Sequence, residues 1–307
     1  MTATQTPTPT QQTPGQVAPR AGVPAPADEA ARPQRRVRGR GGAGVLVAAV
    51  LLAALVLAAV APSLLASQDP FAIKPADAFA APSLGHLFGT DQSGRDVFAR
   101  IVTGARPSLL IGVCATAIGI VLGALLGVLA GLGGRLVDAA VSRVLEVLFA
   151  FPGLILALLV IAITGTGVVT TAVAVGIGTA PGYARMFRAQ TLTVAGSGYV
   201  EAARALGHPP LRVLGRTVVP NVVRPLLVLA TLGVGQAIVW GSSLSFLGLG
   251  AQPPDPEWGA MLSDSRQYIS IAWWLAVIPG LFITGTALLT TVVGRRLQVL
   301  LDGGGGR

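Results

Sequence analysis

Long runs without a charged residue alternate with short polar segments along the whole chain. The uncharged runs occupy 41–68, 107–134, 147–184, 225–254 and 268–294. About 20 consecutive apolar residues suffice to cross the hydrocarbon core of a bilayer as a helix, so each run predicts at least one membrane span. The run 147–184 is too long for one span and contains Gly165-Thr166-Gly167. It therefore predicts two helices joined by a tight turn.

This pattern predicts an all-α integral membrane protein with six transmembrane helices. Both chain ends then lie on one side of the bilayer. Most of the 22 Lys and Arg residues lie before the first helix, in the segments joining the second helix to the third and the fourth to the fifth, and after the sixth. Because basic loops favour the cytoplasmic side, we expect the N- and C-termini to be cytoplasmic.

Within the spans, local residue types predict particular features of packing. The run 107–134 holds many small residues, among them Gly119, Gly123 and Gly127, which allow close approach of neighbouring membrane helices. Pro152 predicts a kink near the start of the third span. Four charged residues between the second and third spans predict a short polar connector; they are Arg135, Asp138, Arg143 and Glu146.

The chain divides into four regions by composition. Residues 1–40, rich in Pro, Thr, Gln and Ala, predict a disordered cytoplasmic tail. Residues 41–104 hold the first membrane helix and an external segment, 105–297 the five remaining spans, and 298–307 a Gly-rich C-terminal tail. A cleaved signal peptide has an apolar core of only about 7–15 residues. The longer run 41–68 therefore favours a retained helix.

Composition agrees with a membrane protein. Apolar residues make up 52% and charged residues 11% of the 307 positions, with a mean hydropathy of +0.69. Soluble domains carry about 25% charged residues. The net charge of +9 is spread between apolar runs, which indicates cytoplasmic loops and anionic lipid headgroups and excludes a nucleic-acid surface. One cysteine, Cys114, and two separated histidines predict neither an internal disulfide nor a metal site.

The chemistry needed to drive transport is missing from the chain. A phosphate-binding loop requires a lysine after glycine, and the single lysine, Lys74, follows Ile73. Ion-coupled carriers bury ionisable groups in mid-membrane, and no span has one at its centre. The residues also offer no serine–histidine or paired-aspartate set for an intramembrane protease. We therefore expect a non-catalytic transport subunit that depends on another protein for energy.

One polar segment, 197–220, has a sequence suited to contact such a protein. Ser197 predicts a helix N-cap, and Glu201 in the first turn complements the helix dipole. Gly207 predicts the end of that helix, and Pro209 or Pro210 the beginning of a second one. The segment therefore predicts a slim helix–turn–helix on the cytoplasmic side, able to enter a cleft of a partner.

The same segment resembles the EAA loop of bacterial ABC-importer permeases. The residues that match this loop in identity and spacing are Glu201, Ala202, Ala203, Gly207 and Pro220. Two further stretches, HLFGTDQSGRDVFARIVTGARPSL and LSFLGLGAQPPDPEWGAML, are similar to the C-type permeases of dipeptide, oligopeptide and nickel importers. The resemblance extends over roughly 85–279.

The resemblance implies the type I ABC-importer permease fold in the bacterial plasma membrane. It also implies a heterodimer with a B-type permease, two cytoplasmic ABC ATPases and an extracytoplasmic substrate-binding protein. ATP would bind to the ATPases, with no cofactor on this chain, and the five matching residues would couple the permease to them. Di- or oligopeptides are the expected substrates, with nickel or another small solute as the alternative.

Two external motifs leave their role open. GTDQSGRD contains Asp91, Arg95 and Asp96, and PPDPEWG contains Asp255, Glu257 and Trp258. Either these residues form structured outer turns, or they act as an external gate or contact the binding protein. A stand-alone channel or carrier, and an adaptor that only tethers an ATPase, are the competing functions that the sequence leaves open.

Overall fold

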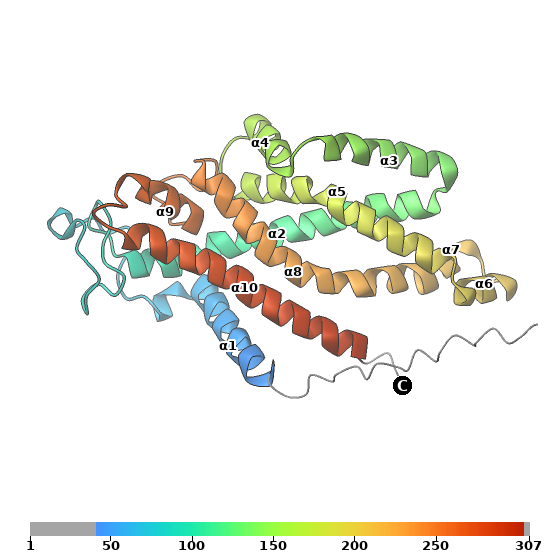
Figure 1. Ribbon diagram of the computed structural model, residues 1–307, viewed down its shortest axis with the longest axis horizontal. Helices are drawn as coiled ribbons and strands as arrows, with labels where there is room; N and C mark the ends of the chain where they lie inside the picture. The colour runs from blue at the N-terminus through green and yellow to red at the C-terminus, as the bar shows by residue number, and fades with distance from the viewer. Residues whose placement is uncertain (1–40, 304–307) are drawn as a thin grey trace, which may run out of the picture. The chain divides into compact units, whose positions relative to one another are not determined.

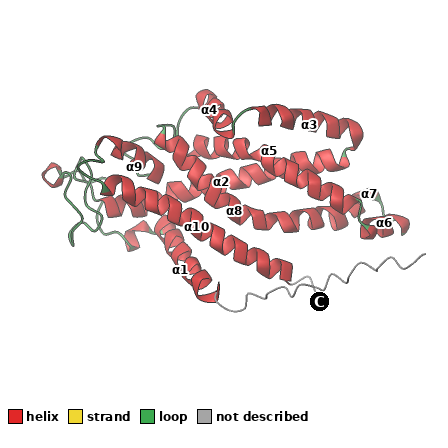
Figure 2. Ribbon diagram, viewed as in Figure 1, coloured by secondary structure: helices red, strands yellow, loops and turns green. Residues whose placement is uncertain are grey.

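A computed structural model describes residues 41–303 of this chain, which fold into helices without a regular strand in that range (Figure 1, Figure 2). The N-terminal tail predicted at 1–40 and the last four residues of the predicted C-terminal tail lie outside the described residues. The α-helices, in chain order, are α1 Gly41–Val60, α2 Val97–Leu132, α3 Gly134–Ala150, α4 Gly153–Thr164, α5 Val168–Ala195, α6 Gly198–Ala205, α7 Pro210–Val213, α8 Val219–Phe246, α9 Trp258–Asp264 and α10 Trp274–Gly303.

Helix α2 is the central element of the described fold. It packs closely against α5 and also contacts α8, α1 and α3 (Figure 1). Glycines allow the approach to α5: a Cβ atom added at Gly123 would lie 2.4 Å from the Cβ of Tyr183, and one at Gly127 would lie 2.5 Å from the Cβ of Phe187. The prediction that small residues bring membrane helices together is confirmed at this contact.

The segment between the second and third predicted spans differs from the expectation. The predicted polar connector is wrong, because its four charged residues, Arg135, Asp138, Arg143 and Glu146, lie inside α3. Helix α3 is amphipathic, so its charges mark one helix face and not a loop. The chain then breaks at Phe151 and Pro152, and α4 continues at 92° to α3. The expected effect of Pro152 is thus a sharp bend.

The predicted break inside 147–184 is confirmed. Helix α4 ends before Gly165 and α5 begins after Gly167, and both glycines have positive φ values, +87° and +142°. Glycine adopts this backbone region without the steric cost that a Cβ atom brings. The two glycines therefore reverse the chain within three residues.

Three of the described helices are long and apolar enough to cross a membrane, within Val97–Leu132, Leu229–Phe246 and Trp274–Leu300. The bent α3–α4 pair passes the same criteria as one interrupted span, and α1 holds a shorter apolar helix, Gly44–Val60. Helix α5 carries Arg185 and Arg188 near its end and does not meet those criteria. The chain is therefore a helical membrane protein, and the number of six spans stays a prediction.

Two helix ends lie away from the predicted positions. Helix α8 ends at Phe246, earlier than the uncharged run, because Gly248 adopts a left-handed φ of +84°. Helix α10 begins at Trp274 and continues to Gly303, so the predicted tail from residue 298 starts within a helix. Uncharged runs locate membrane segments, but the helix ends depend on local turn chemistry.

Candidate functional site

The predicted helix–turn–helix is present as α6 and α7 at one end of the helical part that the structure describes (Figure 1). Helix α6 is held to the fold through Val200, whose side chain is fully buried. Val200 packs in a cluster with Phe187 and Val194 of α5 and with Val213 and Val218 after the turn. Apart from this anchor and the partly buried Ala203, the helix faces outward.

The five residues of the matching motif take different positions on this pair of helices. Glu201, Ala202 and Gly207 are exposed, whereas Ala203 and Pro220 are partly buried. Large apolar side chains lie exposed beside them, with Leu206 76% and Leu211 82% accessible. An exposed apolar surface with a neighbouring acidic residue is typical of a protein-docking site. We define the docking helix as α6 with the turn that follows it.

The turn after α6 forms as predicted at Gly207, whose φ is +76°. The N–H of Gly207 donates to the carbonyl of Arg204 at 2.9 Å, and the N–H of His208 donates to that of Ala203 at 3.3 Å. This pair of bonds is the Schellman arrangement that ends helices at a glycine. The second helix begins at Pro210, one of the two positions expected, and a π-helical turn, Leu214–Val218, joins it to α8.

The expected side-chain cap at Ser197 is wrong in its bonding. Ser197 occupies the N-cap position with an extended backbone, but its hydroxyl does not bond to the first turn of α6. The hydroxyl instead donates to the carbonyl of Val194 at 2.5 Å, at the end of α5. The serine therefore closes the junction between α5 and the docking helix.

The external motif GTDQSGRD folds inward around Asp91. This carboxylate accepts hydrogen bonds from the backbone N–H groups of Ser93 and Arg95, at 2.8 and 3.0 Å. It also accepts from Nε of Arg95 at 2.6 Å and lies 3.7 Å from Nε of Arg100. All three ionisable side chains are buried. A buried charge is stable only when paired and hydrogen-bonded, which this cluster achieves.

Asp96 begins α2. One carboxylate oxygen accepts from the N–H of Ala99 at 2.8 Å, and the other lies 2.9 Å from Nδ1 of His86. Trp274 is buried, and its indole N–H donates to the carbonyl of Thr90 at 3.1 Å. The external segment is thus tied to the starts of α2 and α10.

The second external motif is a helix cap. Glu257 is fully buried and accepts from the N–H groups of Gly259 and Ala260, each at 2.9 Å, at the start of α9. Ser108 of α2 donates to Glu257 at 3.1 Å and accepts from the N–H of Trp258 at 3.1 Å. The indole N–H of Trp258 donates to Ile101. Among the six external residues of the hypothesis, only Asp255 is exposed. The binding-protein contact stays a prediction.

Replacing Glu257 with alanine is expected to destabilise the external junction. Two backbone N–H groups and the Ser108 hydroxyl would lose their buried acceptor, at a cost of about 1–3 kcal/mol. The midpoint of thermal unfolding of the detergent-solubilised protein measures this loss. Asp255→Ala, at the exposed neighbour, serves as the matched control. Equal midpoints for the two variants would contradict the capping role.

Asp264, at the end of α9, lies partly buried near the charged cluster. Burial raises the pKa of its carboxyl, and Arg100 and Arg95 oppose the rise only in part. Because the folded pKa exceeds the unfolded one, ionisation of Asp264 disfavours the folded state above that pKa.

Asp264→Asn should therefore raise thermal stability at neutral pH. The gain should vanish as the pH falls through the raised pKa toward about 4. Melting curves across pH test this, with Asp255→Asn as control; a gain that persists at low pH would contradict it.

Two important contacts lie beyond the sequence-based expectations. Arg188 of α5 donates to both oxygens of Asp138 in α3, at 2.6 and 2.7 Å. Ser108 bridges α2 to the cap at Glu257. No spacing within one element marks these pairs, because the partners lie 50 and 149 positions apart. The contact between Arg188 and Asp138 could have been indicated by the helical spacing of the charged residues in α3, which places Asp138 on the inward face.

Comparisons with known proteins agree with this arrangement. The family model for "Binding-protein-dependent transport system inner membrane component" matches residues 119–303. The dipeptide transport system permease protein DppC of Alkalihalophilus pseudofirmus is 40% identical over 78% of this chain and 79% of its own length. The di/tripeptide permease protein DppC of Pseudomonas aeruginosa is 42% identical over 70% and 71%, respectively. The glutathione permease protein GsiD of Pectobacterium atrosepticum is 42% identical over 72% and 73%.

Solved structures support the fold. An inward-facing form of the MetNI methionine ABC transporter aligns with a TM-score of 0.55 over 66% of this chain and 96% of that chain, at 22% identity. An amino acid ABC transporter aligns with a TM-score of 0.53 over 65% and 92%, at 16% identity. At these identities the likeness concerns the fold alone.

Proposed function

This chain belongs to the binding-protein-dependent transport system inner membrane component family and is a permease subunit of an ABC importer, and we propose that it carries di- or oligopeptides. The observation that carries the coupling part of this proposal is the docking helix. It projects from the fold on one buried side chain, Val200, and leaves Glu201, Ala202 and Gly207 exposed. A chain without a phosphate-binding loop needs such a surface to receive mechanical work.

In the proposed complex, two ABC ATPases bind ATP in the cytoplasm, and this chain binds no cofactor. Their closure moves the docking helix, with Glu201, Ala202, Ala203, Gly207 and Pro220 as the coupling residues. Helix α5 runs into α6 through a single junction and packs on α2, so the movement passes to the spans as a rigid-body shift. The spans then alternate between inward- and outward-open states.

The remaining parts of the proposal concern topology and assembly. Six spans, with α1 as the first and α10 as the sixth, place both termini in the cytoplasm of a bacterium. A B-type permease completes the pathway across a shared interface. An extracytoplasmic binding protein delivers the substrate, with exposed Asp255 as the candidate contact among the external residues.

A surface hollow supports peptides as the substrates. It has a volume of about 360 Å³ and is lined from α2, α3, α4, α5 and α8, with Phe149, Tyr183, Gln236 and Trp240 among the lining residues. No charged side chain lines it. Tyr183 and Gln236 can hydrogen-bond to peptide groups, and the aromatic rings can contact side chains of varied type. Such a surface suits molecules that share a backbone and differ in charge.

Reconstitution into proteoliposomes tests the proposal. The chain is assembled with its two ATPases and B-type permease, and a labelled dipeptide is presented with the binding protein. ATP is expected to drive uptake, and a non-hydrolysable ATP analogue serves as the control. Uptake by this chain alone would show a carrier and overturn the coupling proposal. ATP-driven uptake of nickel without uptake of the peptide would overturn the substrate.

A further inference from the structure

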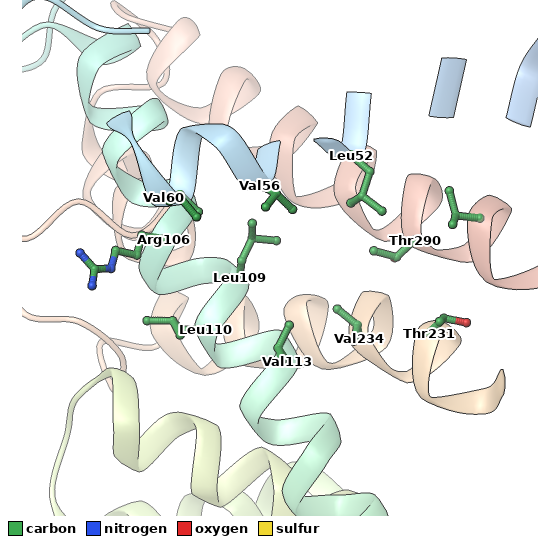
Figure 3. Close-up of a pocket in the computed structure, with 12 residues that line it drawn as sticks. Leu52, Val56, Val60, Arg106, Leu109, Leu110, Val113, Thr231, Val234 and Thr290 are labelled. Carbon is green, nitrogen blue, oxygen red and sulfur yellow. The ribbon is translucent and has the colours of Figure 1, made fainter. Parts of the chain in front are cut away.

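An apolar groove lies between α1 and the helices against which it packs (Figure 3). Its volume is about 570 Å³, and four helices line it: α1, α2, α8 and α10. Leu52, Val56 and Val60 of α1 face Leu109 and Val113 of α2 across the groove (Figure 3). Its walls are therefore aliphatic along most of their length.

The groove has a charged lining residue at one end only. Arg106 of α2 lies beside Val60 at that end, and its guanidinium points away from the aliphatic walls (Figure 3). The side chain is exposed and has no hydrogen bond or ion pair within the described part of the chain. Helix α1 carries no polar side chain in Gly41–Val60. An occupant must therefore be apolar along its length, and an anionic group is favoured only at the Arg106 end.

The size of the groove restricts the occupant further. With its side chains, a helix is about 10–12 Å wide and rises about 1.5 Å per residue. A volume of 570 Å³ would hold only about three to five residues of such a helix. An acyl chain is much thinner, and a phospholipid carries its negative phosphate at one end of an apolar body. We propose that the groove holds one acyl chain of a bilayer phospholipid, whose phosphate pairs with Arg106.

The proposal requires that the chain lie in a bilayer, but not that it carry peptides. Its failure would therefore leave the proposed transport function unaffected. Two variants probe it from different sides. Val113→Trp fills the groove from α2, and Arg106→Gln removes the charge while keeping a long side chain. Their matched controls are Val121→Trp, exposed on α2 outside the groove, and Arg295→Gln, exposed on α10.

The experiment is native mass spectrometry of the whole delipidated transporter, titrated with phosphatidylglycerol. The wild type and both controls are expected to bind one more phosphatidylglycerol molecule tightly than Val113→Trp does. Arg106→Gln is expected to bind that lipid about fivefold more weakly, the effect of one basic residue at a lipid headgroup. Binding of phosphatidylglycerol by Val113→Trp equal to that of the wild type would overturn the proposal.

Two further outcomes also decide against it. If Arg106→Gln binds as the wild type does, the phosphate contact is wrong. If Val113→Trp releases the partner permease while Val121→Trp does not, the groove receives a protein helix and not a lipid. Copurification of the partner subunit, measured on the same samples, separates this last outcome from simple misfolding.

Discussion

Gly207→Val is expected to reduce ATP-driven uptake by between about five- and thirtyfold while the chain still inserts and folds. Gly207 has a φ of +76°, and a left-handed backbone costs an ordinary L-residue about 1–2 kcal/mol. No heavy atom lies within 4 Å of an added Cβ, so the Cβ atom itself causes no clash. The cost falls on the turn that orients α6. ATP hydrolysis should continue, because the ATPases are separate chains, so transport and hydrolysis become uncoupled.

Gly134→Val is the matched control for this experiment. Gly134 is also exposed, has a left-handed φ of +77° and has open space around an added Cβ, but it lies at the start of α3. Uptake and hydrolysis are measured on the same proteoliposomes for both variants. Normal uptake with Gly207→Val, or an equal loss with Gly134→Val, would show that the turn after α6 does not carry the coupling.

Gly127→Val should destabilise the whole helical core. An added Cβ at Gly127 would lie 2.5 Å from the carbonyl oxygen of Ala184 and 2.8 Å from the backbone N of Arg188. Backbone atoms cannot rotate away as a side-chain end can, so α2 and α5 must separate. Overpacking of this kind typically costs about 1–3 kcal/mol. The expected result is a clear fall in the unfolding midpoint in detergent and in the yield of assembled complex.

The control removes the effect of helix propensity. Gly285→Val makes the same replacement inside α10, where an added Cβ has no neighbour within 4 Å. Both variants lose glycine and gain a β-branched residue in a helix. A similar melting midpoint for the two would show that the contact between α2 and α5 contributes little to stability.

Several features of this fold were predictable because the responsible signal is local. Gly165 and Gly167 break the chain through their own backbone freedom, and Gly207 ends α6 for the same reason. The small residues of α2 predicted close packing, because a residue without a side chain permits close approach of whichever helix packs against it. The EAA motif likewise lies within one short segment, and the end of its helix follows directly from Gly207.

Other features depend on partners distant in the sequence. Asp91 and Glu257 are residue types expected on a surface, but the turn after Asp91 and the first turn of α9 supply N–H groups that require acceptors. The four charged residues of α3 are typical of a loop in sequence. The pairing of Asp138 with Arg188 becomes known only from the fold. The Ser197 hydroxyl could accept from the first turn of α6 or donate to a nearby carbonyl, and only the fold shows that it donates to the end of α5.

The π-helical turn Leu214–Val218 connects the docking helix, through α7, to α8. A π turn holds one residue more than an α turn. It therefore takes up one extra residue without the rotation of about 100° that an added residue causes in a regular α-helix. Deleting one residue there would restore a regular helix and leave Glu201 facing nearly the same direction. In the proposed complex, the angle at which α6 meets the ATPases is thus independent of that one residue between α7 and α8.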